Sequence, residues 1–223
     1  VTVVDKGRSV GGRLATRRIA GATFDHGAQF FTVRDPEFAD IVSHWVDAGV
    51  VHEWCRGFES AGDGHPRYVG SSGMTAIAKY LALDLDVRCS SLVFSVARNE
   101  AEWVVTLDDN TNITCDAIIM TCPIAQSFGF AFTAGIELPE NLRVIDYHRT
   151  LALLAVLDQP SLVPAPGGMQ NPDSTFSFIG DNVAKGISSV PAVTFHANPE
   201  WSLAHWDDNH DDAHALLIEL AAP

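Results

Sequence analysis

The stretch "VTVVDKGRSVGGR" at residues 1–13 constrains the fold more than any other part of the sequence. Its β-branched run predicts a short buried strand, which ends at Asp5. In dinucleotide-binding folds, an acidic residue in this place accepts hydrogen bonds from the ribose hydroxyls of an adenosine. The stretch therefore predicts a nucleotide-handling strand and turn, although an ordinary solvated turn residue would explain Asp5 equally simply.

The turn after this strand contains two glycines and an arginine. Gly11 and Gly12 would let a backbone approach a pyrophosphate closely, and the planar guanidinium of Arg13 would hold phosphate oxygens. The glycines are also compatible with a plain turn. Four arginines, at positions 8, 13, 17 and 18, gather near this end of a chain whose net charge is −14, which favours a local anion site.

Charge and cysteine usage exclude several classes of protein. The acidic net charge argues against nucleic acid or an anionic membrane as a general partner, because both require a basic surface. No run of 18 apolar residues is present and Asp5 interrupts the apolar start, so neither a membrane span nor a signal peptide is expected. The four cysteines lack CxxC spacing, which favours the reducing cytoplasm, and Cys115 and Cys122 are expected to be small core residues.

Helical and extended segments alternate in the first part of the chain. Residues 35–50 predict a helix that has Pro36 near its start and Gly49 at its end, and residues 73–86 predict a second. Residues 24–35, "FDHGAQFFTVRD", predict extended structure. Its Gly27 indicates the close approach of a flat ligand or another backbone, or a simple β-bulge.

The apolar period changes to two after residue 86. Residues 87–115 predict a β-meander with turns at "NEAE" and "DDNTN", and residues 116–123, "DAIIMTCP", predict a buried strand. The order of elements predicts an α/β or α+β fold. The remaining segments predict strands over 148–158 and 189–197, a loop over 162–176 and a helix over 211–222.

Three further patterns bear on metal binding, catalysis and packing. In "HWDDNHDDAH", His210 and His214 stand four residues apart and could bind a metal together with His205, but an acidic helix start with solvated histidines is the preferred interpretation. No metal site is therefore predicted. Neither a GxSxG elbow nor the lysine of a phosphate loop is present. Core or domain-interface positions are expected for Trp45, Trp54 and Trp201.

Several quoted segments resemble one protein family. The segments "VDKGRSVGGRLATRR", "FDHGAQFFTVRDPEF", "YVGSSGMTAIAKYLA", "DAIIMTCPIAQ" and "FHANPEWS" look like the renalase family of flavoproteins, within the wider amine-oxidase superfamily. The resemblance covers nearly the whole chain, and its first block is the most specific part. It implies a dinucleotide (FAD)-binding α/β domain with an inserted α+β substrate domain that contains a mixed β-sheet.

The resemblance also implies a role for individual residues. Asp5 would hold the adenosine ribose, and Lys6 together with the Gly11–Arg13 turn would lie along the ribose and pyrophosphate. The isoalloxazine ring would lie close to Gly27, Ala28, Gln29 and Phe30. Three later positions are implied as well: Val93, whose backbone would meet the adenine; Pro123, at the end of a strand returning beside the cofactor; and the catalytic candidate His196, facing the flavin.

The function implied by the resemblance is that of an FAD-dependent oxidase. Dihydronicotinamide dinucleotides, as isomers of NAD(P)H, would pass a hydride to flavin N5, and oxygen would reoxidise the flavin to give hydrogen peroxide. The small-molecule substrate and oxygen would be its partners, with no nucleic acid and no membrane. The alternatives are a flavin amine oxidase or desaturase, or a catalytically silent fragment or nucleotide-binding module.

The family pattern further implies how the chain is divided. The FAD-binding portions would be residues 1–35 and 68–127, and the substrate portions would be 36–67 and 128–223. A first strand with a GxGxxG loop would precede Val1, and a further FAD segment would follow the last residue, so the sequence is expected to be truncated at both ends.

Overall fold

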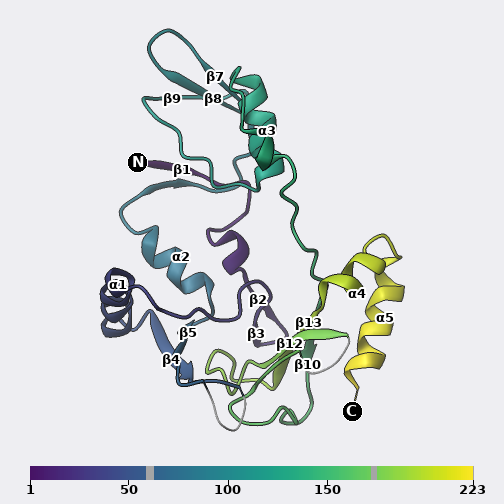
Figure 1. Cartoon of the computed structure of the whole chain (residues 1–223). Coiled ribbons are helices and arrows are strands. Elements are labelled where there is room, and N and C mark those ends of the chain that lie inside the picture. Colours follow the sequence, from purple (N-terminus) through teal and green to yellow (C-terminus); the bar gives the residue numbers. More distant parts are fainter. Residues whose placement is uncertain (59–62, 172–174, 223) are drawn as a thin grey trace. The chain divides into compact units, whose positions relative to one another are not determined.

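The computed structural model describes residues 1–58, 63–171 and 175–222. By the contacts within it, the chain divides into two compact units (Figure 1). Unit 1 comprises Val1–Val10 and Asp84–Tyr147, and unit 2 comprises Gly11–Leu83 and His148–Pro223. This division rests on contacts and not on ligands, so the cofactor and substrate portions expected from the sequence stay a prediction.

Unit 1 begins with a short parallel pair of strands. Strand β1 (Thr2–Val4) pairs with β6 (Asp86–Arg88), and the amide of Asp5 continues the ladder by donating to the Arg88 carbonyl at 2.9 Å. The strand itself was correctly predicted, but its burial was not. Val3 is 37% exposed, because β6 is the one neighbour that the described residues provide for β1.

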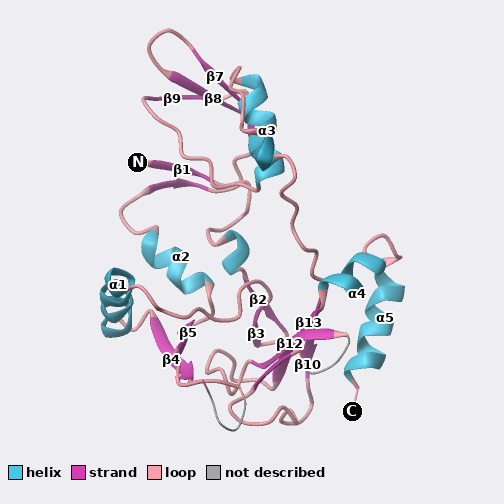
Figure 2. Ribbon diagram, in the orientation of Figure 1, coloured by secondary structure: helices cyan, strands magenta, loops and turns pink. Residues whose placement is uncertain are grey.

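The predicted β-meander is confirmed. Strands β7 (Val93–Arg98), β8 (Trp103–Leu107) and β9 (Asn112–Cys115) form an antiparallel sheet, and the turns lie at the two predicted places. The residues that form its core are Val96, Val105 and Leu107. Helix α3 (Ile124–Thr133) lies beside β7, where the Thr133 hydroxyl donates to the Val96 carbonyl at 3.0 Å (Figure 2).

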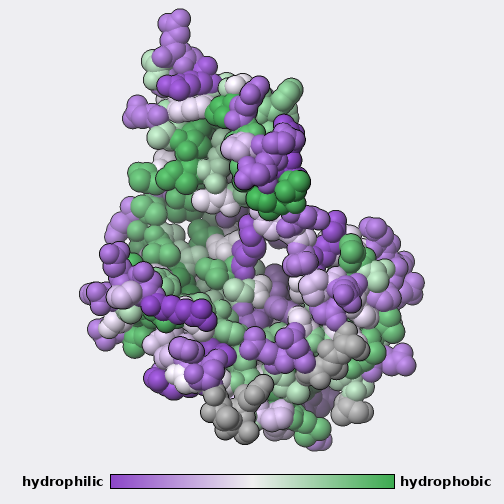
Figure 3. Space-filling view, viewed as in Figure 1, coloured by the Kyte–Doolittle hydropathy of each residue, from purple (hydrophilic) through white to green (hydrophobic). Residues whose placement is uncertain are grey.

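The strand predicted over residues 116–123 is wrong. These residues are in irregular backbone, and Ile119 is 89% exposed. An apolar run becomes a strand only where a partner strand satisfies its backbone groups, and the described residues provide none here. Pro123 consequently ends no strand and instead precedes α3. Cys115 is half-buried and packs against the meander core, as predicted, and Cys122 is half-buried. Figure 3 shows hydrophobic residues interspersed with hydrophilic ones on the surface of the molecule.

The first half of unit 2 contains two β-hairpins and two helices. Strands β2 (Thr16–Ile19) and β3 (Ala22–Asp25) meet in a two-residue turn whose residues have positive φ, at 50° and 81°. Helix α1 (Pro36–Asp47) and helix α2 (Thr75–Leu81) pack on the hairpin of β4 (Val51–Cys55) and β5 (Arg67–Gly70). Both helices were predicted, and the Asp35 carboxylate caps α1 by accepting from the amide of Phe38 at 3.0 Å.

The second half of unit 2 is built on a four-stranded sheet. Its order is β10 (Ala152–Val156), β13 (Ala192–Ala197), β12 (Phe176–Asp181) and β11 (Gly168–Gln170), and its pairings are antiparallel rather than mixed. Helix α4 (Pro199–Ala204) follows β13, and helix α5 (His210–Ala221) packs on β10. The expected α/β fold class is confirmed.

Strand β13 separates an apolar face from a polar one. Side chains alternate along a strand, so Phe195 and Ala197 point to one side and pack in the cluster that contains Leu217 of α5. Thr194 and His196 point to the opposite side, toward the end of β3. The polar residues of this second face form the candidate site described below.

Several elements of unit 2 were not anticipated, namely β2, β4, β5, β11, β12 and α4. The loop predicted over 162–176 contains β11, and neither β12 nor α4 was expected; residues 172–174 of that loop lie outside the described residues. Strand β12 has small and polar residues among its apolar ones, which conceals its alternation. None of the described helices combines the length and apolar character that crossing a membrane requires.

Candidate functional site

The glycine turn adopts a backbone that requires glycine. Gly11 has φ +125° and Gly12 has φ +49°, and a 3-10 helix (Gly12–Leu14) follows directly. Apart from Gly12 and its two chain neighbours, no heavy atom of the described residues lies within 4 Å of the place where a Cβ of Gly12 would stand, so its backbone is open to an incoming group. Arg13 lies in the same turn and is exposed.

Gly27 is explained by a neighbouring backbone. A Cβ on Gly27 would lie 2.0 Å from the carbonyl oxygen of Arg13, and the next amide, of Ala28, donates to that same oxygen at 2.9 Å. Of the alternatives that the sequence left open, close approach of another backbone is therefore the one observed. The contact ties the two predicted segments, Gly11–Arg13 and Gly27–Phe30, directly together within unit 2.

The side chain of Gln29 is buried and fully engaged within the protein. Its amide nitrogen donates to the carbonyls of Asp25 at 2.6 Å and Gly27 at 3.2 Å. Its amide oxygen accepts from the ammonium group of Lys185 at 3.2 Å. Gln29 thus fixes the segment that was predicted to pass near the flavin ring, and its own polar atoms serve protein contacts.

Asp25 is the centre of this buried polar cluster. One carboxylate oxygen accepts from the Met74 amide at 2.8 Å and from the Thr16 hydroxyl at 2.6 Å. The other lies 2.8 Å from the Lys185 ammonium, and both side chains of this ion pair are 0% exposed. Burial lowers the pKa of Lys185, and the charge of Asp25 opposes that shift.

His196 borders the same cluster from strand β13. Its Nε2 atom lies 3.2 Å from the His26 carbonyl oxygen and 3.3 Å from the Gln29 amide nitrogen. The Phe178 ring, at a centroid distance of 6.4 Å, lies beside the imidazole. The structure therefore brings His196 together with Gln29, which the family resemblance had placed in one site.

Acid should destabilise unit 2 through two histidines. Desolvation lowers the pKa of His196 below its ordinary value of 6.5, and the positive charge of Lys185 lowers it further. The hydrogen bond to the His26 carbonyl acts in the opposite direction and raises this pKa. Burial and the charge of Arg17 lower the pKa of His26, whereas the charge of Asp25 raises it. Because the unfolded chain binds these protons at higher pH than the folded chain, the free energy of unfolding should fall as the pH drops below about 6.5.

Chemical denaturation at pH 7.5 and at pH 5.5 measures this effect. Carboxylates elsewhere in the chain also lose favourable interactions in acid, so the comparison is made between the wild type and His196→Gln, which cannot titrate. The variant should lose less free energy of unfolding between the two pH values. An equal loss in both proteins would contradict the assigned role of His196.

An aromatic cluster adjoins the polar one. The Phe30 ring lies 5.3 Å from Phe58 and 6.0 Å from Phe178, and the guanidinium of Arg67 stacks over Phe58 at 4.7 Å. Trp54 belongs to the same cluster, and the Lys185 ammonium lies 5.7 Å from its ring centroid. These rings exclude water from one side of the buried ion pair, which strengthens its electrostatics.

The predicted cofactor residues of unit 1 have simpler surroundings. One carboxylate oxygen of Asp5 accepts from the Gly7 amide at 2.7 Å, so Asp5 organises its own turn, and Lys6 is exposed. Val93 pairs with Leu107 and packs with the meander core, whereas Pro123 stands at the start of α3. Their ligand contacts stay a prediction.

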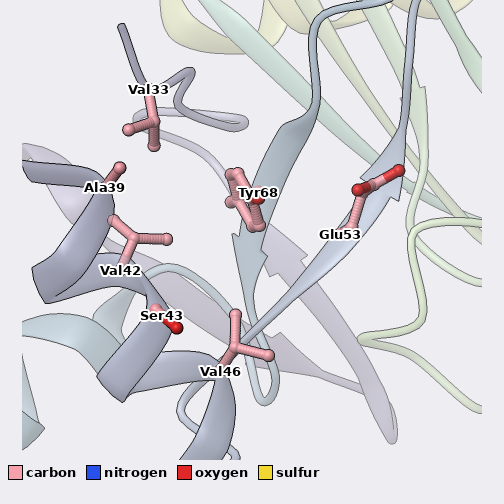
Figure 4. Close-up of a pocket in the computed structure, with 7 residues that line it drawn as sticks. All are labelled: Val33, Ala39, Val42, Ser43, Val46, Glu53 and Tyr68. Carbon is pink, nitrogen blue, oxygen red and sulfur yellow. The ribbon is translucent and has the colours of Figure 1, made fainter. Parts of the chain in front are cut away.

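A separate hollow lies between α1 and the β4–β5 hairpin. It has a volume of about 280 Å³ and is lined mainly by apolar side chains of α1, with Tyr68 and Glu53 opposite (Figure 4). The Glu53 carboxylate is engaged with the Arg56 guanidinium at 2.8 Å. Because Glu53, the charged residue of its lining, is already paired in this way, no function is assigned to this hollow.

The acidic histidine segment does not gather ligands around a centre. His210 and His214 lie on α5 with ring centroids 6.4 Å apart, and the Nδ1 atom of His205 lies 2.6 Å from a carboxylate oxygen of Asp208. Within the described residues, no group of three or more possible ligands is arranged to hold a metal ion. The predicted core role of the tryptophans is confirmed, since Trp45, Trp54 and Trp201 all pack in hydrophobic clusters.

Comparison with known proteins identifies the architecture to which this geometry belongs. Residues 1–45 match the family model of a NAD(P)-binding Rossmann-like domain. Wild-type putrescine oxidase bound to putrescine superimposes with a TM-score of 0.68 over 97% of this chain and 74% of its own, at 13% sequence identity. This chain has the fold of putrescine oxidase.

Two further structures agree with that assignment. A triple mutant of putrescine oxidase gives a TM-score of 0.67 at 14% identity, again over 97% of this chain and 74% of its own. A putative protoporphyrinogen oxidase from Exiguobacterium sp. 255-15 gives 0.53 at 14% identity, over 69% of this chain and 36% of its own. At these identities the likeness establishes the fold, and residue roles must come from the site itself.

Sequence reasoning missed the residues that hold the site together. Asp25 was read as part of an extended stretch, and Lys185 in "DNVAKG" was not singled out. Asn182 was also missed, although its buried amide donates to the Thr194 hydroxyl at 3.0 Å and orders the turn that carries Lys185. A polar turn between two strands usually lies on the surface, so only the tertiary contacts distinguish this one.

Proposed function

We propose that this protein is an FAD-dependent oxidoreductase. The observation that carries the proposal is the pair of segments joined by the Ala28–Arg13 hydrogen bond, in a chain with the fold of putrescine oxidase. The Gly11–Arg13 turn fits a pyrophosphate, because the backbone at Gly12 is open and an arginine stands beside it. Asp5 has a carboxylate oxygen to offer to the adenosine ribose, as its position after β1 suggests.

Within that class we propose the renalase type of substrate, a dihydronicotinamide dinucleotide. FAD, when bound, supplies a hydride acceptor that oxygen can regenerate with release of hydrogen peroxide. The protein's own part is to orient the donor and exclude water, since hydride loss from a dihydropyridine requires no strong base. The charge of Asp25 is compensated by Lys185, so the described neighbours of His196 offer no uncompensated carboxylate to a cationic substrate.

A flavin amine oxidase is the second candidate, and the fold shared with putrescine oxidase favours it. Such an enzyme acts on a deprotonated amine in an apolar cage, and the rings of Phe30, Phe58 and Phe178 would suit that role. The buried ion pair does not decide between the two substrates, because the reacting group of each, a dihydropyridine ring or a deprotonated amine, is uncharged. Substrate tests must therefore separate them.

Spectroscopy of the purified protein tests the proposal. We expect a yellow protein whose flavin absorbance is bleached anaerobically by 1,2- or 1,6-dihydro-NAD(P) and not by putrescine. Acid precipitation should release the colour into the supernatant, because the FAD is expected to be held non-covalently. Bleaching by amines alone would identify the second candidate, and a protein that binds no flavin would contradict both.

Arg13→Ala should weaken FAD retention more than Arg18→Ala. Arg13 stands in the glycine turn, and a hydrogen bond from a charged group to phosphate is worth about 1.5–3 kcal/mol, or roughly tenfold to a hundredfold in the dissociation constant. Arg18 lies on β2, outside the glycine turn, and donates to the Ser72 carbonyl at 3.3 Å, so it is a matched control. Equal dissociation constants, measured by flavin fluorescence, would remove the assignment of Arg13.

The cellular setting and the electron acceptor are proposed on other grounds. Cys55, Cys89, Cys115 and Cys122 are all unpaired, which supports the cytoplasm. Oxygen as the acceptor follows from the proposed oxidase chemistry, and peroxide release on turnover measures it directly.

A further inference from the structure

We propose that the Nδ1 atom of His196 is the hydrogen-bond acceptor for an N–H donor of the substrate, because the other ring nitrogen is committed to the His26 carbonyl. This inference rests on the proposed function. It specifies which part of a nicotinamide dinucleotide the site would recognise, namely the carboxamide.

The orientation of the Gln29 amide is set by Lys185. An ammonium group only donates hydrogen bonds, so the Gln29 atom that faces it at 3.2 Å must be the carbonyl oxygen. The amide nitrogen then points to the carbonyls of Asp25 at 2.6 Å and Gly27 at 3.2 Å. Its two hydrogens are both used in these contacts.

This orientation decides the tautomer of His196. The Nε2 atom lies between the His26 carbonyl oxygen and the Gln29 amide nitrogen, at 3.2 and 3.3 Å. The carbonyl can only accept, and Gln29 has no further hydrogen to give, so the hydrogen of the neutral ring must be on Nε2. The lone pair is then on Nδ1.

Nδ1 is available to a ligand. It has no hydrogen-bond partner among the described residues, and His196 is only half-buried. Phe178 lies beside the ring and supplies an apolar wall for a planar ligand. An acceptor next to a flat apolar surface suits the uncharged carboxamide of nicotinamide, whose nitrogen donates and whose ring stacks.

The surrounding charges keep His196 an acceptor. The charged and titratable groups near it are Lys185, Asp25 and His26, and Lys185 forms an ion pair with Asp25. Burial and Lys185 both disfavour the imidazolium form, which would be a donor at both nitrogens. A carboxylate in place of the carboxamide would bring its lone pairs against that of Nδ1.

Two measurements test the inference without relying on turnover. In protein labelled with ¹⁵N-histidine, long-range proton–nitrogen correlations at pH 7.5 should show Nε2 of His196 protonated and Nδ1 unprotonated. In the flavin-loaded protein, calorimetry compares NAD⁺ with nicotinic acid adenine dinucleotide, which carries a carboxylate in place of the carboxamide. We expect NAD⁺ to bind about tenfold more tightly. With the carboxylate, the Nδ1 acceptor would face a group that has no hydrogen to donate, and leaving it unpaired costs about a factor of ten in affinity.

Two substitutions separate the ring nitrogens. His196→Asn places an amide oxygen near the position of Nδ1 and should keep most of the preference for NAD⁺. His196→Gln can reach the His26 carbonyl but loses the Nδ1 acceptor, and should bind both dinucleotides about equally. Retention of the full preference by His196→Gln would overturn the inference.

The wild type alone can also overturn it. A hydrogen on Nδ1, or equal affinity for the two dinucleotides, would show that His196 does not read the carboxamide while leaving the proposed oxidoreductase intact. Flavin-loaded protein that binds neither dinucleotide would instead show that the proposed substrate class is wrong.

Discussion

Lys185→Met should lower the free energy of unfolding by about 3–5 kcal/mol, which is the cost of leaving a buried charge without its partner. Asp25 would keep its hydrogen bonds from Met74 and Thr16 but would lose the ammonium that compensates its charge at 2.8 Å. Gln29 would lose a donor as well. Equilibrium denaturation in urea at pH 7.5 measures the change.

The double variant Asp25→Asn/Lys185→Met is the control. Asparagine can still accept from Met74 and Thr16, so removing both charges replaces an unpaired buried ion by an unpaired amide, which costs only about 1–3 kcal/mol. The double variant should therefore be more stable than Lys185→Met alone. A double variant that is no more stable would show that the ion pair does not account for the loss.

Elements whose determinants lie close together along the chain were predicted correctly from the sequence. The helix over residues 35–50 was predicted because its proline and its terminal glycine both lie within that segment, and the structure has α1 at Pro36–Asp47. The meander was predicted for the same reason, since its turns join adjacent strands. The glycine turn was also anticipated, and its positive φ angles are a property of those residues alone.

Features that depend on distant residues were missed or misjudged. The apolar run at 116–123 has the composition of a strand, but pairing is decided by whether another strand lies alongside. Lys185 lies in a polar turn of ordinary appearance, and its burial depends on Gln29, which is 156 residues away, and on Asp25. Periodicity carries no information about which distant residues pair, so the core of the candidate site could not be predicted from the sequence.

Gly27→Ala should destabilise the protein by about 4 kcal/mol. The new Cβ would stand 2.0 Å from the Arg13 carbonyl oxygen, and neither backbone can yield without breaking the hydrogen bond from Ala28 to that oxygen. Overpacking of this kind costs up to about 3 kcal/mol and the lost hydrogen bond about 1 kcal/mol more. Urea denaturation gives the change in the free energy of unfolding.

Gly12→Ala is the matched comparison, because it also adds one methyl group to a glycine of the same two segments. Within the described part of the chain, no heavy atom beyond Gly12 and its two neighbours lies within 4 Å of its Cβ position, so the cost is only that of φ +49° for an L-residue, about 1–2 kcal/mol. Gly27, by contrast, has a φ outside the left-handed region, so its penalty would come from the contact alone. If Gly27→Ala were as mild as Gly12→Ala, the two segments would not be held together by close backbone contact, and the reason for placing them in one site would be lost.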